Sequence, residues 1–302
     1  MSQEVSLESA GEGQDLGSST GAGAVKVQQC DEAPLERSLE WSDIKGALTT
    51  QSRVIHALIM RETLSRYGDH KLGFLWAILE PLLMVTMIAS VLSVMRGDSP
   101  GGMPLVPFMI TGFVPFFMFR NTMNQLKNAV ASNRKLLGFP QVTTFDAIVA
   151  RVLLEGGVLL AVFVFMLSMA HLIGFEFRIE NPLGVLVVCL CLLLLGTGIG
   201  FVLATLIPVI PSVGQVSSLI FGRPMMVTSG LFFTAESVPE PFRGWLLYNP
   251  ILHLMELMRS SFFYEFESPY GSWFYAGSWV LGTFTFGLLI HQALRRRAII
   301  GL

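Results

Sequence analysis

The sequence predicts an all-α integral membrane protein with six transmembrane helices. Charged residues make up only 14% of the 302 residues and apolar residues 52%, whereas a soluble domain carries about 25% charge. The mean hydropathy is +0.59. The charge deficit is local, because several stretches of about 20 residues are almost free of charge, and that is the length a helix needs to cross a bilayer.

The apolar stretches define the expected spans and divide the chain into two parts. Residues 1–49 are rich in Gly, Ser and Gln and mostly acidic in their charge, so we expect a disordered cytoplasmic tail. Residues 50–302 would form the transmembrane domain. Its expected spans are 72–95, 105–126, 147–173, 183–207, 213–233 and 273–292.

The distribution of Lys and Arg sets the expected orientation, because basic residues favour the cytoplasmic side. They gather before the first span, between the second and third, and after the sixth: Lys45, Arg53, Arg61, Arg66, Lys71, Lys127, Arg134, Lys135, Arg151, Arg295, Arg296 and Arg297. The opposite side holds only Arg96, Arg178, Arg243 and Arg259. Both termini are therefore expected in the cytoplasm, and an even number of spans agrees with this.

Ahead of the first span, residues 50–66 carry apolar residues at helical spacing, although Glu62 falls in the apolar arc. A basic helix next to a span favours a position in the membrane interface, and a soluble helix packed on a partner is the alternative. The cytoplasmic segment 128–151 combines Arg134 and Lys135 with Leu136, Leu137 and Phe139. Exposed apolar residues of this kind favour a docking element for a soluble partner over a plain solvated loop.

Residues 236–266 lie between the fifth and sixth spans and are interrupted by prolines and glycine. The apolar core, 251–263, is too short to cross a bilayer. We therefore expect one or two short helices that enter the outer leaflet from outside and shape the mouth of a pathway. Glu256 and Arg259 are three residues apart and are expected to pair on one helix face.

Charged residues inside spans are the main functional candidates, since a charge facing lipid is costly. These are Glu80, Arg120 and Arg223. Mutual pairing for stability is the alternative role, whereas Glu155 is expected to pair with Arg151 at the base of its helix. Pro81 follows Glu80 and removes a backbone donor, so the first span is expected to bend there or to leave a backbone carbonyl free.

Other patterns are structural or absent. The aromatic residues Trp76, Phe113 and Phe116 suit sugar stacking, but aromatic residues also fill lipid-facing surfaces and interfacial belts. Gly196 and Gly200 have the spacing of close helix packing. The sequence lacks a metal-ligand cluster and the G-x-x-x-x-G-K-[ST] phosphate loop, so we expect no cofactor on this chain and no ATP hydrolysis by that route.

Three stretches together resemble a known family: "RETLSRYGDHKLGFLWAILEPLL" (61–83), "NRKLLGFPQ" (133–141) and "YNPILHLMELMR" (248–259). Their order against the spans is similar to the permease subunits of type-2 ABC exporters for polysaccharides, above all the capsular-polysaccharide export permeases. The similarity covers nearly the whole chain after residue 50. The long acidic tail departs from the compact N-terminus of the family.

The resemblance implies a homodimer in the bacterial inner membrane with two separate ATPase chains, which bind ATP and Mg. It implies a lipid-linked polysaccharide as cargo and periplasmic and outer-membrane export components as partners, and no nucleic acid. Segments 50–66 and 128–140 would contact the ATPases, and 236–266 would form external gate helices.

The sites that we expect on this basis fall into four groups. The substrate path comprises Arg120, Arg223, Glu80, Phe113, Phe116 and Trp76, and the entry for an anionic head group comprises Arg66 and Lys71. The ATPase coupling site comprises Arg134, Lys135, Leu137 and Phe139. The external gate comprises Trp245, Tyr248, Glu256 and Arg259.

Rival functions stay open at this point. An ABC permease for O-antigen, teichoic acid, lipid or drug would share the fold and differ in cargo. An ion-coupled carrier would need discontinuous helices and often two similar halves, and the sequence indicates neither. A membrane-embedded enzyme would need a nucleophile with its base or a metal set, and neither is found.

Overall fold

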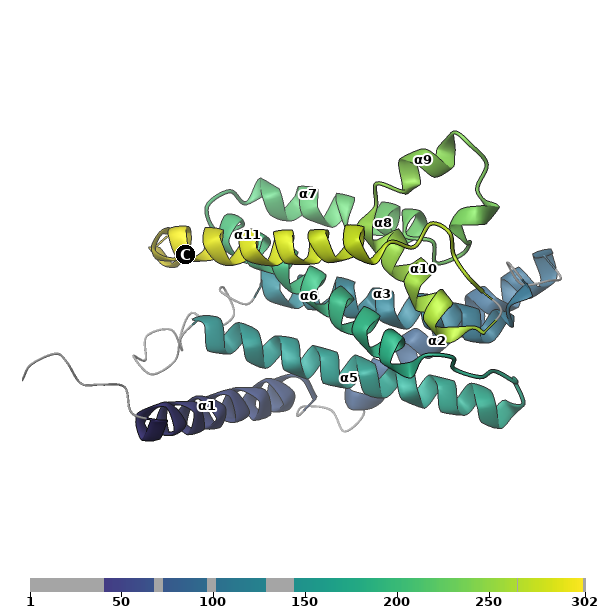
Figure 1. Ribbon diagram of the computed structural model, residues 1–302. Coiled ribbons are helices and arrows are strands. Elements are labelled where there is room, and N and C mark those ends of the chain that lie inside the picture. The colour runs from purple at the N-terminus through teal and green to yellow at the C-terminus, as the bar shows by residue number, and fades with distance from the viewer. Residues whose placement is uncertain (1–40, 68–72, 97–101, 129–143, 265, 301–302) are drawn as a thin grey trace, which may run out of the picture. The chain divides into compact units, whose positions relative to one another are not determined.

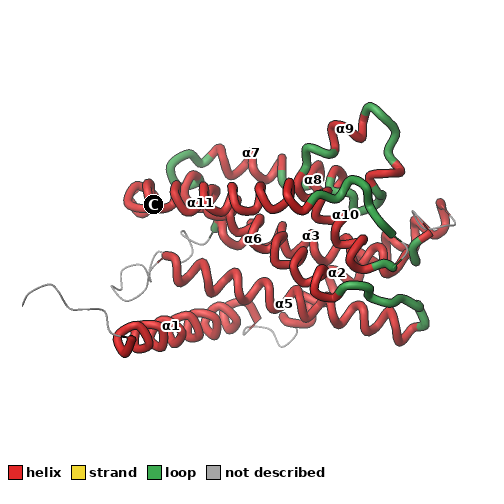
Figure 2. Tube along the Cα trace, in the orientation of Figure 1, coloured by secondary structure: helices red, strands yellow, loops and turns green. Residues whose placement is uncertain are grey.

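A computed structural model describes residues 41–67, 73–96, 102–128, 144–264 and 266–300 (Figure 1). By its internal contacts the chain divides into Met1–Ile44 and Lys45–Leu302. Every regular element in the described residues is helical (Figure 2). The expected disorder of the tail lies almost wholly outside these residues, although α1 already begins at Trp41.

Long helices occur at five of the six expected spans. They are α2 (Gly73–Arg96), α3 (Leu105–Lys127), α5 (Thr144–Ile173), α6 (Pro182–Leu206) and α11 (Trp273–Ile300). The basic segment ahead of the first span is also helical, as α1 (Trp41–Tyr67). The apolar runs therefore located these helices, and most boundaries lie within a few residues of the expected ones.

Three helices among the described residues are long and apolar enough to cross a membrane: Phe145–Ile173, Pro182–Leu206 and Trp273–Ala293. The apolar part of α2, Ile78–Val94, is shorter. These helices agree with an integral membrane protein, while the count of six spans stays a prediction.

The fifth expected span, 213–233, is not one continuous helix. It consists of α7 (Ser212–Ile220) and α8 (Arg223–Thr228), which are separated at Phe221 and Gly222. A Cβ atom on Gly222 would lie 2.5 Å from the Ser218 carbonyl oxygen, so only glycine fits this break. Our sequence argument against discontinuous helices was therefore wrong, because an apolar run does not reveal where its backbone hydrogen bonds are interrupted.

The segment 236–266 contains short helices, while their entry into the outer leaflet from outside stays a prediction. They are the 3-10 turn η2 (Ala235–Ser237), α9 (Phe242–Leu246) and α10 (Pro250–Phe262). The helix α10 packs against α6, α11 and α3, and nearly all of its residues are buried. In contrast, α9 contains no buried residue.

The helix α6 is the centre of the packing, with α3 on one side and α11 on another (Figure 1). Added Cβ atoms show why small residues occur there. One on Gly196 would lie 2.5 Å from the Phe119 carbonyl oxygen on α3, and one on Gly198 would lie 2.7 Å from the Phe284 nitrogen on α11. One on Gly200 would also be too close to a side chain of α3. The predicted close packing at Gly196 and Gly200 is confirmed, and Gly198 extends it to a second neighbour.

This packing predicts that Gly198→Val destabilises the protein, because the added atoms meet backbone rather than a side chain that can turn away. Overpacking of this kind costs about 1–3 kcal/mol or more. Gly282→Val, on the neighbouring helix α11, is the control, since nothing lies within 4 Å of its added Cβ. The measurement is the melting temperature of the detergent-purified protein. Equal melting temperatures for the two variants would contradict the packing account.

Candidate functional site

The helix α10 begins with a well-defined cap. Asn249 accepts a hydrogen bond from the Ile251 nitrogen through its Oδ1 (3.0 Å), and Pro250 occupies the first helical position. Proline suits that position because its missing N–H would have no helical partner there. The Nδ2 atom of Asn249 also donates to Thr228 Oγ1 and Ser229 Oγ, both at 3.2 Å. The start of α10 is thus attached to the end of α8.

Further along α10, Arg259 is completely buried and holds the segment that follows α8. Its Nη1 donates to the Phe233 carbonyl oxygen (2.8 Å), and its Nη2 donates to those of Gly230 (2.5 Å) and Leu231 (3.3 Å). The guanidinium carbon lies 3.9 Å from the centre of the Phe108 ring on α3. A buried cation needs such partners, because an isolated charge in an apolar interior is very costly.

Glu256 provides the opposite charge, one helical turn before Arg259. Its Oε1 lies 3.8 Å from Arg259 Nη1 and accepts a hydrogen bond from the Ala235 nitrogen (2.9 Å). Its Oε2 accepts from Ser268 Oγ (2.6 Å). The pairing predicted from the sequence is confirmed. We name Asn249, Glu256 and Arg259 the α10 clamp, because they join α10 to the segments on both sides of it.

Gly230 is the backbone position that makes the α10 clamp possible. Its φ is +73°, a conformation that side-chain-bearing residues rarely adopt. A Cβ atom there would also lie 2.5 Å from Leu252 Cδ1. The turn therefore requires glycine for two reasons, and it presents the carbonyl oxygen that Arg259 binds.

The four residues expected at the external gate separate into two kinds. Glu256 and Arg259 are 1% and 0% exposed and lie in the interior. Trp245 and Tyr248 are 76% and 73% exposed, and their ring centres are 6.5 Å apart. Glu256 and Arg259 fix the position of α10. Trp245 and Tyr248 present an aromatic surface just before the start of α10. A gating role for any of the four stays a prediction.

The residues expected along the substrate path do not form one cluster in this chain. Arg120 is half-buried, with its guanidinium carbon 5.9 Å from the Phe117 ring centre. Arg223 and Glu80 are exposed, and Trp76 is 63% exposed. Among the described residues, neither arginine forms an ion pair with Glu80 or with another carboxylate. The alternative of mutual pairing is therefore not realised within the described part of the chain.

Phe113 and Phe116 lie in the hydrophobic core and are completely buried. Phe113 packs edge-on against Phe232, with ring centres 5.5 Å apart, and Phe116 packs near Phe119. Interior packing accounts for both residues, and a role in the path stays a prediction.

The expected head-group and coupling residues cannot be placed. Lys71, Arg134, Lys135, Leu137 and Phe139 lie outside the described residues. Arg66 belongs to α1, but its side chain is likewise outside the description.

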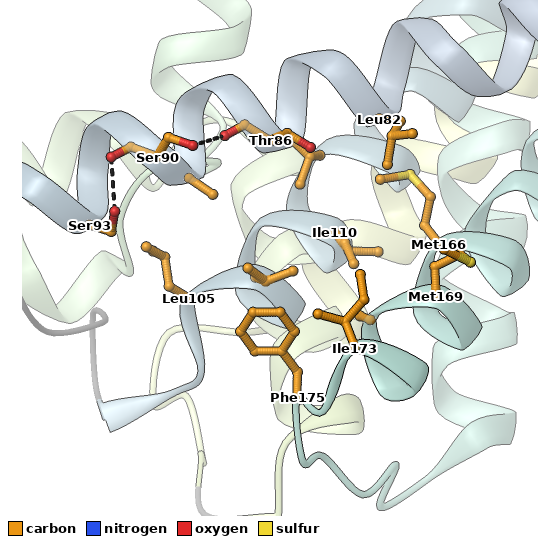
Figure 3. A pocket seen from close by; sticks show the side chains of 14 residues that line it. Leu82, Thr86, Ser90, Ser93, Leu105, Ile110, Met166, Met169, Ile173 and Phe175 are labelled. Carbon is orange, nitrogen blue, oxygen red and sulfur yellow. Dashed lines mark hydrogen bonds between the residues drawn. The ribbon is translucent and has the colours of Figure 1, made fainter.

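One cavity, of about 440 Å³, opens between α2, α3 and α5 (Figure 3). Its wall is almost entirely apolar, and its serines turn toward their own helix. Ser90 Oγ donates to the Thr86 carbonyl oxygen (2.7 Å), and Ser93 Oγ donates to that of Ser90 (2.8 Å). A hydrated sugar entering here would lose hydrogen bonds without replacement. This cavity is therefore unsuited to a glycan.

One partner of Arg151 was not foreseen from the sequence. An ion pair joins Arg151 to Glu62 on α1, with 3.1 Å between its Nη2 and Glu62 Oε1. Pairing of Arg151 with Glu155 stays a prediction. The sequence did contain a signal for this ion pair, because Glu62 is a carboxylate within the apolar arc of a helix. Such a position requires a cation on the surface that the arc contacts.

Comparison with known proteins identifies the class. A family model described as "ABC-2 type transporter" matches residues 53–263, which is more than half of the chain. The chain therefore belongs to this family of transporter membrane proteins. Its break at Gly222 does not make it an ion-coupled carrier, since family membership now decides between these classes.

Individual relatives cover most of their own length and of this chain. The polysialic acid transport protein KpsM of Escherichia coli is 27% identical over 248 residues, which are 82% of this chain and 96% of KpsM. The capsule polysaccharide export inner-membrane protein CtrC of Neisseria meningitidis serogroup B is 33% identical over 243 residues, 78% and 89% of the two chains. BexB of Haemophilus influenzae, which bears the same description, is 32% identical over 232 residues, 76% and 86%.

The α10 clamp predicts a large loss of stability when one charge is removed alone. Arg259→Met leaves Glu256 buried without its cation and three carbonyl groups without their donor. Breaking a buried pair in this way costs about 3–5 kcal/mol. We expect a lower melting temperature and less monodisperse protein, with partial recovery in Arg259→Met/Glu256→Gln.

The control for this experiment is Glu240→Gln, which alters the pair of the exposed Glu240 with the half-buried Arg243 at the surface (3.6 Å). Exposed pairs contribute about 0–1 kcal/mol, so this variant is expected to melt close to the wild type. An Arg259→Met protein as stable as this control would contradict the role of the clamp.

Proposed function

We propose that this chain is the membrane subunit of an ATP-driven exporter that moves a lipid-linked capsular polysaccharide across the bacterial inner membrane. Two copies of the chain and two separate ATPase chains form the transporter. ATP and Mg²⁺ are bound by the ATPases. The chain contributes the passage through the membrane and has no hydrolytic site of its own.

One observation carries the proposal. Relatives described as capsule polysaccharide export inner-membrane proteins align with about three quarters of the chain and with most of their own length. The fold supports it, since the described helices include three of membrane-spanning length. The cavity between α2, α3 and α5 is apolar and therefore unsuited as a route for sugars. This favours a sugar path at the surface of the helices.

Both termini lie in the cytoplasm in this proposal, and the α9–α10 region lies outside. The support is the distribution of Lys and Arg. The segment 128–140 then faces the ATPases, with Arg134, Lys135, Leu137 and Phe139 as the coupling residues. Arg66 and Lys71 receive the anionic head group of the glycolipid at the cytoplasmic side.

The path lies along surfaces of this chain that the second copy completes. Arg223, Glu80 and Trp76 are exposed on the single chain, and Arg120 is partly accessible. A polar or cationic group exposed on an apolar helix is costly against lipid, which supports a wet passage in front of these residues. Trp245 and Tyr248 present their rings at the exit.

The test is reconstitution of the chain with the ATPase encoded beside it in liposomes that contain a lipid-linked capsular glycan. We expect the glycolipid to stimulate ATP hydrolysis and to become accessible on the far side. Leu137→Asp is expected to reduce both about tenfold or more, since a coupling loss of 1–3 kcal/mol corresponds to about 5–150-fold. Glu176→Gln, an exposed change far from that segment in sequence, serves as the control.

Two outcomes would overturn the proposal. Transport driven by an ion gradient without ATP would indicate a carrier. Stimulation by a small apolar drug or by phospholipid alone, with no response to the glycolipid, would indicate an ABC permease for another cargo.

A further inference from the structure

A buried arginine joins three helices at one end of the described fold. Arg151 of α5 is 6% exposed. Its Nη2 lies 3.1 and 3.3 Å from the two carboxylate oxygens of Glu62 on α1. Its Nη1 donates a hydrogen bond to the Gln125 carbonyl oxygen on α3 (2.9 Å). One guanidinium therefore holds α1, α3 and α5 at the same time.

The positions of Gln125 and Arg151 in the chain indicate what this contact does. Gln125 lies just before the end of α3 at Lys127, and Arg151 lies in the first turns of α5, which begins at Thr144. The two residues therefore flank the segment 128–143. A displacement of the end of α3 or of the start of α5 acts on Arg151, and through Arg151 on Glu62.

Side chains rather than close backbone packing attach α1 to the rest of the unit. The backbone of α1 makes few close approaches to other helices. A second polar link joins Gln51 to Asp146, which is also buried on α5. Among the side chains of α1 that the structure describes, Leu58 and Glu62 are buried, and they lie one turn apart. The position of α1 thus depends on long polar side chains that reach α5.

Stability alone is a weak reason for such a pair. Two buried charges lose much hydration, and apolar residues of similar volume often stabilise a protein equally well. An arginine adds a defined orientation, because its planar guanidinium group binds two acceptors in fixed geometry. A lysine ammonium is a single point charge on a flexible stem and does not reproduce that arrangement.

We infer that Arg151 is a positioning residue that transmits movement of the end of α3 and the start of α5 to α1. The inference rests on the proposed function, in which the ATPases act on the membrane subunit from the side of these helix ends. When ATP binding moves these helix ends, Arg151 and Glu62 carry α1 with them. Without the link, the ATPases hydrolyse ATP while α1 no longer follows and export declines.

The experiment uses the full complex of this chain with its ATPase in liposomes. The quantity measured is the number of glycolipids exported per ATP hydrolysed, for each assembled complex. We expect Arg151→Lys and Glu62→Gln each to lower this ratio at least about fivefold while the complexes still assemble. We expect the double variant to be no worse than either single variant, since both changes break the same link.

Matched controls make the same chemical changes at exposed positions. Arg178→Lys and Glu180→Gln lie between α5 and α6 and are exposed, and we expect both to keep the wild-type ratio. A purely structural role would lower the amount of assembled complex and leave the ratio unchanged.

The outcomes separate this inference from the proposed function. If the wild-type complex exports and couples normally and both Arg151→Lys and Glu62→Gln keep the wild-type ratio, the inference is overturned and the proposed function stands. It is also overturned if neither variant assembles, because the link is then structural only. If the wild-type complex shows no ATP-dependent export, the proposed function fails and the inference fails with it.

Discussion

A charged guanidinium inside an apolar interior is the constraint on which the α8–α10 end of the molecule depends. Arg259 is completely buried, and its stability requires the carbonyl oxygens of Gly230, Leu231 and Phe233 together with Glu256. Those carbonyls are available because Gly230 adopts a positive φ and because α8 has already ended. A buried ion and an irregular backbone segment therefore satisfy each other, and neither would be stable alone in this environment.

The rest of the fold divides into a closely packed centre and more loosely attached elements. Glycines bring α6 against the backbones of α3 and α11, so this centre is rigid. At its edges, α7 and α8 are short and separated by a break, and α1 is attached by Arg151 and Asp146. The proposed function needs this combination, because there a closely packed frame supports parts that change position when the ATPases act.

Sequence reasoning found what depends on composition along the chain. The apolar runs located α2, α3, α5, α6 and α11, and the spacing of Glu256 and Arg259 revealed their pairing. Sequence reasoning missed features that depend on residues close in space but distant in the chain. The need for glycine at position 222, in the break between α7 and α8, arises from the Ser218 carbonyl oxygen one turn away, and the burial of Phe113 and Phe116 arises from packing between helices. Glu62 looked like an imperfection of α1 because its cation is 89 residues away in sequence.

The central claim is that the α9–α10 region faces outward and the segment 128–140 faces the ATPases. Its most direct test is labelling of intact spheroplasts with a membrane-impermeant thiol reagent. The native Cys30, Cys189 and Cys191 would first be replaced by serine. Cysteine at Glu240 or Asp98 is then expected to react from outside, whereas cysteine at Lys135 reacts only after the membrane is opened. Reaction of the Lys135 variant from outside, with protection of the Glu240 and Asp98 variants, would contradict the account.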